Sequence, residues 1–393
     1  MLLKEPVGFV TEFIDAVNQE IKSTHAGKRL TKAQRYWLSF CVSAILMTNG
    51  VCWAWFERVS IGQYKLSSLS WMFRRGKICW NWLIISSLQV VLRKYGISEG
   101  VLVLDDSDRA RSKNTTHLAH VHKQKDKKTG GYVMGQNLVF LVLVTPKITI
   151  PVGFLFYQPD PVRSAWAKED RRLKVLGVRK KERPKEPARD PNYPTKRELG
   201  LNLLRQFRQS FSHIHVQCIL ADAFYSDGDF MDKASGIFDG TQVISQLRHN
   251  QMTKLQGKER TIRSYFNSFP GITKLLPIRF GEQQLVMLGG GRLWVKAHQK
   301  KRYVIALRYQ GEQEDRYLVA TNMTWRMTDI AEAYTMRWLV GVSRLRTLHL
   351  VGESPTEVKD SSLVAWEASW RASKTMEPSD NIFRKEYAQC TRL

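Results

Sequence analysis

The spacing of the hydrophobic positions changes near residue 98. Before it, apolar residues cover most faces of the segment Tyr36–Thr48 and continue over Trp80–Tyr95, which predicts buried helices. Thr31 precedes the first of these segments and Gln34 follows three residues later, the pattern of a capping box at a helix start. We therefore expect residues 1–98 to form a helical N-terminal domain.

From Val101 onward, short continuous apolar runs replace this pattern, as is typical of strands buried on both faces. These runs cover Val101–Leu104, Asn137–Val144, Pro151–Tyr157 and Val216–Ala221, and a helix is expected at about Thr195–Ser210. Several shorter β-like runs follow between residues 240 and 320, with a hairpin turn expected at Gly289–Gly291. A last helix is expected to begin near Thr328.

The charge balance points to a polyanionic partner. Lys and Arg number 61 against 36 Asp and Glu, a formal net charge of +25. Such an excess favours nucleic acid, because each phosphate contact releases condensed counterions; contact with ribosomes or a membrane surface is the alternative. Residues 158–197 are rich in Pro, Lys and Arg and predict a mobile basic loop. The side chains expected to contact DNA are those of Arg171 and Arg172 in this loop, and of Lys123 and Lys125 in an earlier one.

Other function classes are disfavoured by the sequence. The five cysteines are scattered and never form a C-x-x-C pair, which argues against a disulfide framework or a thiolate zinc site and fits a reducing cytoplasm. The apolar stretches Trp37–Met47 and Trp82–Leu92 are too short for a membrane span. We expect a soluble, cytoplasmic protein without membrane contact.

Two aspartates directly follow buried runs: Asp105 after Val101–Leu104, and Asp222 after Val216–Ala221, 117 residues later. They can meet only if the two strands are neighbours in one sheet. Carboxylates at neighbouring strand ends can hold Mg²⁺, which activates water and stabilises the leaving oxygen in phosphodiester displacement. The alternative for each aspartate is a turn residue that accepts bonds from the following backbone amides.

Three segments resemble the DDE transposases of insertion sequences, in particular the group with a Tyr-x2-Arg-x3-Glu-x6-Lys signature. They are VLVLDDSD at 101–108, CILADAFYSDGDFM at 218–231 and IAEAYTMRWLVGV at 330–342. The resemblance covers roughly residues 98–340 in order. It implies an α/β fold with an RNase H-like mixed sheet flanked by helices, an N-terminal helical domain and a β-rich insertion.

The same resemblance implies a metal site. Asp105 and Asp222 match the first two catalytic ligands of Mg²⁺ (or Mn²⁺), and Asp106 remains the alternative to Asp105. Tyr334 and Arg337 fill the Tyr and Arg places of the signature, where the arginine would contact a DNA phosphate or a catalytic carboxylate.

The sequence departs from the family after Arg337. The place of the catalytic Glu falls at Gly341 and that of the Lys at Leu348, and no carboxylate lies between Glu332 and Glu353. We hypothesise that the reading frame leaves the transposase near Gly341, through a frameshift or an inserted element. Losing one of three carboxylates weakens a two-metal site, so this copy is expected to bind DNA and cut it poorly.

By resemblance, the protein is a transposase that cuts DNA at terminal inverted repeats and joins the ends to target DNA, as a homodimer on paired ends. The alternatives are a non-catalytic DNA-binding remnant that interferes with an intact transposase, and an unrelated metal-dependent nuclease. The predicted parts are a helical domain that binds DNA ends or caps its neighbour (1–98), the first part of the core with the basic loop (99–222), a β-rich insertion (223–325), the start of the signature helix (326–341) and a tail unlike the family (342–393).

Overall fold

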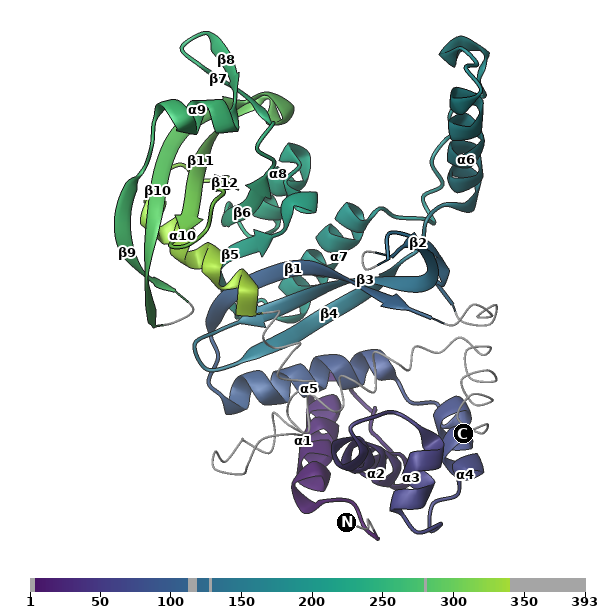
Figure 1. Ribbon diagram of the computed structural model, residues 1–393. Coiled ribbons are helices and arrows are strands. Elements are labelled where there is room, and N and C mark those ends of the chain that lie inside the picture. Colours follow the sequence, from purple (N-terminus) through teal and green to yellow (C-terminus); the bar gives the residue numbers. More distant parts are fainter. Residues whose placement is uncertain (1–3, 112–118, 127–128, 279–280, 340–393) are drawn as a thin grey trace. The chain divides into compact units, whose positions relative to one another are not determined.

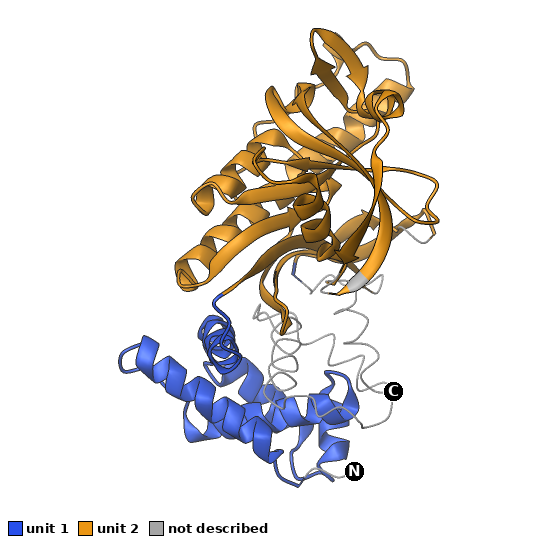
Figure 2. Cartoon of the chain, turned by 90° about the vertical axis from the view of Figure 1, so that its left-hand side faces the viewer, with its two compact units in different colours: residues 1–98, 114–119, 346–393 blue, residues 99–113, 120–345 orange. Residues whose placement is uncertain are grey.

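The computed structural model describes residues 4–111, 119–126, 129–278 and 281–339. The chain divides into two compact units: residues 1–98 with 114–119 and 346–393, and residues 99–113 with 120–345 (Figure 2). The predictions for Gly341, Leu348 and the tail 342–393 lie outside the described residues. Among those residues, no single helix is long and apolar enough to cross a membrane, although α2 and α3 together, bent by 90° at the break between them, meet the test of length and composition.

The first unit is helical, as its apolar pattern predicts. Its helices are α1 (Gly8–Thr24), α2 (Lys32–Thr48), α3 (Trp53–Val59), α4 (Leu66–Arg75) and α5 (Trp80–Lys94). The predicted capping box starts α2: the Gln34 amide N–H donates to Thr31 Oγ1 (3.2 Å) and the Thr31 amide N–H donates to Gln34 Oε1 (2.8 Å). Trp37 of this helix packs against Trp53 and Phe73, so aromatic rings fill the core between α2, α3 and α4.

The second unit is built on one mixed sheet of twelve strands (Figure 1). The strands are β1 (Glu99–Ala110), β2 (His122–Lys125), β3 (Tyr132–Val144), β4 (Thr149–Tyr157), β5 (His215–Ala221), β6 (Gln242–Leu247), β7 (Met252–Leu255), β8 (Lys258–Thr261), β9 (Ile272–Ile278), β10 (Glu282–Val295), β11 (Lys300–Tyr309) and β12 (Arg316–Ala320). Their order is β2-β3-β1-β5-β6-β12-β11-β10-β7-β8, with β4 paired to β3 and β9 to β10. β5 is parallel to β1 and β6, whereas β3 is antiparallel to β1.

Helices flank this sheet. They are α6 (Pro161–Val175), α7 (Lys196–Ser210), α8 (Gly228–Ile237), α9 (Ile262–Ser268) and α10 (Met327–Thr335), with short 3-10 turns η1 (Lys180–Glu182), η2 (Ala223–Tyr225) and η3 (Lys296–His298). A large mixed sheet flanked by helices confirms the predicted fold class.

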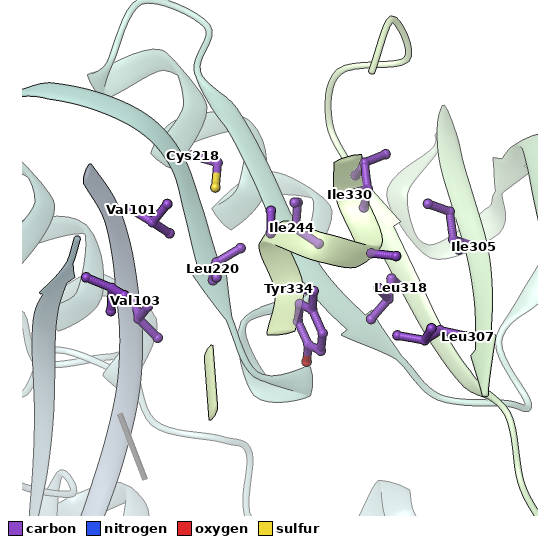
Figure 3. Close-up of a cluster of buried hydrophobic side chains, with 14 of the residues drawn as sticks. Val101, Val103, Cys218, Leu220, Ile244, Ile305, Leu307, Leu318, Ile330 and Tyr334 are labelled. Atoms are coloured by element: carbon purple, nitrogen blue, oxygen red, sulfur yellow. The ribbon is translucent and has the colours of Figure 1, made fainter. Parts of the chain in front are cut away.

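Opposite faces of β1 pack against different helices. Val101 and Val103 share a core cluster with Ile330 and Tyr334 of α10 (Figure 3). Leu104 faces the other way, toward α7: a Cβ on Gly200 would meet Leu104 Cδ2 at 2.7 Å, so the glycine lets α7 approach β1 closely. The period of two along β1 therefore directs alternate side chains toward α10 and toward α7.

Two local predictions were wrong. Residues 161–175 of the predicted basic loop form α6, because Asp160 caps the helix and Pro161 occupies its first turn. The glycines 289–291 are not a turn, since they pair with Val304–Ala306 in the middle of β10. A Cβ on Gly291 would lie 2.8 Å from the Tyr265 hydroxyl, so glycine serves close packing at this position.

Candidate metal centre

The parallel pairing of β1 with β5 brings the two predicted aspartates together. In this register Leu104 lies opposite Ala221; Asp105 is the next residue of β1, and Asp222 directly follows the end of β5. One carboxylate oxygen each from Asp105, Asp106 and Asp222 lies within 4.8 Å of the others. A separation of 117 residues in the chain is thus closed by strand pairing, as the metal prediction requires.

The two strands end differently around this cluster. β1 does not stop at Asp105 but continues to Ala110, paired with β3. Its residues are half-buried from Asp105 and exposed from Asp108 onward. β5 ends at Ala221, directly before Asp222, whose Oδ1 accepts a bond from the Phe224 amide N–H at 2.9 Å and caps η2. Asp222 therefore also has the turn role considered as the alternative, and it keeps a second oxygen for another partner.

Adjacent residues of β1 face different helices and meet different cations. Asp105 continues the face of Val101 and Val103, and its Oδ1 lies 3.9 Å from Arg337 Nη2, just beyond α10. Asp106 faces α7, where Lys196 Nζ lies 2.5 Å from its Oδ2. The Asp106 amide N–H also donates to Asp105 Oδ1 at 2.9 Å. One cation thus approaches the cluster from each side of the sheet.

The surroundings of Asp222 disfavour its charged form. Burial raises the pKa of this carboxyl, and the charges of Asp106 and Asp105 raise it further, against the opposing effects of the Phe224 amide and Arg337. The charges of Asp105 and Asp106 thus repel a negative charge on Asp222. A divalent cation would relieve this repulsion, and an all-carboxylate donor set suits Mg²⁺ or Mn²⁺ rather than a soft metal.

Two functional candidates at this cluster escaped sequence reasoning. Lys196 begins α7 ninety residues after Asp106, and nothing local links the two. Tyr225 follows Asp222 by three residues and is fully buried, and its hydroxyl has no hydrogen-bond partner among the described residues. Burial raises the pKa of Tyr225, as do the charges of the three aspartates, so the hydroxyl keeps its proton. In the sequence, the signal that could have pointed to Tyr225 was its position three residues after Asp222.

The residues predicted to bind DNA differ in their exposure. Tyr334 is only 1% exposed and lies in the core, where its hydroxyl donates to Gln246 Oε1 (3.4 Å), so its predicted DNA contact was wrong (Figure 3). Lys123 and Lys125 are exposed on β2, and Lys123 Nζ lies 4.8 Å from the centre of the Tyr132 ring. Arg171 and Arg172 are exposed on α6. The DNA contacts of these four cations stay predictions.

The predicted departure from the family falls outside the described residues. Gly341, in the place of the catalytic Glu, is not described by the structure. Within the described part of the chain, the carboxylate cluster contains aspartates and no glutamate.

Comparison with known proteins identifies the family. Among solved structures, the chain is similar to the crystal structure of the NurA nuclease from Sulfolobus solfataricus, with 10% identity over 64% of this chain and 82% of that chain and a TM-score of 0.30, which is too weak to bear on the assignment. No curated protein matches the chain. A model of the DDE superfamily endonucleases matches residues 58–264, more than half of the chain, and this stretch includes all three clustered aspartates. The chain therefore belongs to the DDE superfamily endonuclease family.

Proposed function

We propose that this protein is the transposase of an insertion sequence, which cuts DNA at the ends of its element with Mg²⁺ (or Mn²⁺) held by Asp105 and Asp222. The observation that carries the proposal is the convergence of these carboxylates on neighbouring parallel strands within a DDE endonuclease. The bound ion would polarise the scissile phosphate and lower the pKa of the attacking water.

The residues around the cluster have complementary tasks in this proposal. Asp105 and Asp222 supply ligand oxygens, and the amide of Phe224 holds the Asp222 carboxylate in orientation. Arg337 lies near Asp105 Oδ1 and is placed to bind a phosphate oxygen of the substrate. Lys196 balances the charge of Asp106. Asp106 remains the alternative first ligand, since one of its oxygens belongs to the same cluster.

We further propose that cleavage by this copy is slow. Gly341 stands where the family signature has its Glu, so the signature helix supplies no third carboxylate. Asp106 is the third carboxylate of the described cluster, but Lys196 already engages it. The Gly341 substitution also favours the second candidate, a DNA-binding remnant that occupies element ends without cutting them. Translating all reading frames just downstream of codon 340 tests the frameshift: a displaced Glu-x6-Lys sequence supports it, and its absence contradicts it.

The remaining parts of the proposal rest on the sequence resemblance alone. They are recognition of terminal inverted repeats, strand transfer and a homodimer on paired ends. A cytoplasmic location rests on the scattered cysteines. The net charge of +25 supports DNA as the partner.

Nicking of labelled element-end DNA in Mg²⁺ or Mn²⁺ tests the proposed chemistry. We expect slow, metal-dependent nicking that Asp105→Asn and Asp222→Asn each reduce by about 100-fold or more, because each removes an anionic ligand. Asp239→Asn is the matched control, since Asp239 is 82% exposed and has a left-handed backbone that asparagine also tolerates.

The other outcomes separate the candidates. Binding of element ends without any nicking would identify a remnant, and equal cleavage of DNA without terminal repeats would identify a general nuclease. A larger loss in Asp106→Asn than in Asp105→Asn would make Asp106 the first ligand.

A further inference from the structure

Residues 158–195 form an arm that leaves the sheet at the end of β4 and returns at the start of α7 (Figure 1). Its main element, α6, contains no buried residue, and it extends away from the sheet in the figure. At its far end Val175 is 83% exposed. A fifteen-residue helix that adds nothing to a core needs another explanation for its presence.

The arm is braced from within. Trp166 Nε1 donates to the Pro184 carbonyl at 2.8 Å, and Arg183 Nη1 lies 2.9 Å from Asp170 Oδ1. At its base, Asp160 caps α6 and also accepts a bond from the Asp190 amide N–H at 3.5 Å. These contacts tie the returning segment to one face of α6, so the helix has a preformed shape without help from the sheet.

The opposite face of α6 is cationic. At 100° per residue, Lys168, Arg171 and Arg172 project from the side opposite Trp166 and Asp170. All three are exposed, and no acidic residue shares the centre of their face; Glu169 lies at its border, paired with Arg172. The whole arm holds eleven Lys and Arg against six Asp and Glu, a net charge of +5.

We propose that this outward face of α6 binds the phosphates of duplex DNA, independently of sequence, next to the site of cutting. The inference rests on the proposed function, in which DNA is the substrate. The charge of this face favours DNA as its partner, because a helix face with three cations and no acid at its centre complements a polyanion. The same face carries Ser164 and Ala165 but no Asn or Gln, so phosphate contact explains it better than base readout.

Both ends of the arm lead to the metal centre. Tyr157 precedes the arm, and Lys196 follows it with its Nζ 5.6 Å from the centre of the Tyr157 ring. The same Lys196 Nζ contacts Asp106 at 2.5 Å. A duplex bound along α6 would therefore be connected, through the base of the arm, to the metal centre proposed to cut it.

Duplex affinity of the full-length protein, measured at several salt concentrations, tests this inference. The triple variant Lys168→Gln/Arg171→Gln/Arg172→Gln should bind random-sequence duplex at least about tenfold more weakly near 100 mM salt. Its slope of log affinity against log salt should become shallower by about 2.7, because three phosphate contacts are lost. The control Arg205→Gln/Arg208→Gln/Lys233→Gln removes the same charge from α7 and α8 and should change affinity less than about threefold.

Further outcomes decide between a phosphate contact and its rivals. The double variant Arg171→Lys/Arg172→Lys leaves Lys168 unchanged and keeps all three positive charges. It should keep most of the affinity, because a phosphate contact needs charge. A loss as large as in the triple Gln variant would contradict the inference. An unchanged affinity in that Gln variant would also overturn it, while Asp222-dependent nicking would leave the proposed function standing. A loss of self-association with unchanged DNA affinity would assign the face to a second copy of the chain. Absence of DNA binding by the unaltered protein would instead overturn the proposed function itself.

Discussion

Asp222 and Asp232 lie ten residues apart in the chain and in the same unit, yet their surroundings differ. Asp232 has its counter-ions built in: Arg302 Nη1 lies at 2.8 Å and Lys300 Nζ at 3.4 Å. Partial burial would raise the pKa of Asp232, but the bonds from Arg302 and Lys300 outweigh it and lower that pKa. At Asp222, burial and two neighbouring carboxylates prevail and raise the pKa.

Asp232 therefore stabilises the fold, whereas the surroundings of Asp222 suit the binding of a metal ion. Arg302 is only 1% exposed, and besides Asp232 it donates to His298 Nδ1 (3.3 Å) and the Gly228 carbonyl (3.4 Å). It thereby ties α8 to the hairpin of β10 and β11. Asp222 instead shares a half-buried sheet edge with Asp105 and Asp106, whose charges raise its pKa, and a metal ion would offset this repulsion.

The largest effect is expected where the built-in counter-ion is removed. Arg302→Ala should lower the free energy of unfolding by about 2–3 kcal/mol, because the buried Gly228 carbonyl and the half-buried His298 ring lose a charged donor. Urea unfolding measures this. The exposed pair of Arg263 and Glu314 is the control, since Arg263→Ala should cost under about 0.5 kcal/mol. Equal losses in the two variants would contradict the structural role of Arg302.

The next largest effect is expected from adding a divalent cation to the Asp105–Asp222 site. With a dissociation constant of roughly 1 mM, 10 mM Mn²⁺ should stabilise the unaltered protein by about 1.4 kcal/mol. Asp105→Asn/Asp222→Asn should lose this gain, whereas Asp232→Asn should keep it. Thermal unfolding with and without Mn²⁺ provides the measurement, and an equal gain in all three proteins would place the ion elsewhere.

A smaller effect is expected from removing the positive charge of Lys196 next to Asp106. Lys196→Met should tighten Mn²⁺ binding by about threefold, roughly 0.7 kcal/mol, because the ammonium no longer competes for Asp106. Titration followed by electron paramagnetic resonance reports free Mn²⁺ directly. Lys233→Met, on an exposed pair with Asp229, should leave affinity unchanged. Weaker binding in Lys196→Met would show that the lysine organises the site instead.

The smallest effect concerns pH at the Arg302 site. Burial lowers the pKa of His298, and the charge of Arg302 lowers it further, so the folded protein favours the neutral ring. Its Nε2 can then donate to the Ser226 carbonyl (2.7 Å) while Nδ1 accepts from Arg302.

Because the folded pKa lies below the unfolded value of about 6.5, this contribution is present above that value and lost as pH falls through the folded pKa. Unfolding measured between pH 7.5 and 5 should show a smaller loss in His298→Gln, which preserves both bonds. An identical pH profile in the two proteins would contradict this assignment.

The sequence by itself determined the features that depend on local pattern. Apolar spacing sufficed for the helices of residues 1–98 and for the strands around Val101 and Val216, because burial imposes its period on each element separately. The same pattern singled out Asp105 and Asp222 as the residues that follow two buried runs.

Only the tertiary structure decided what these residues meet. Strand pairing placed Asp105, Asp106 and Asp222 together, and the packing of α7 brought Lys196 to Asp106 from ninety residues away. Tertiary packing likewise turned the glycines at 289–291 into strand, and the internal bracing of the arm accompanies a helix where composition suggested a loop. Such contacts depend on distant parts of the chain, and no local period along the sequence encodes them.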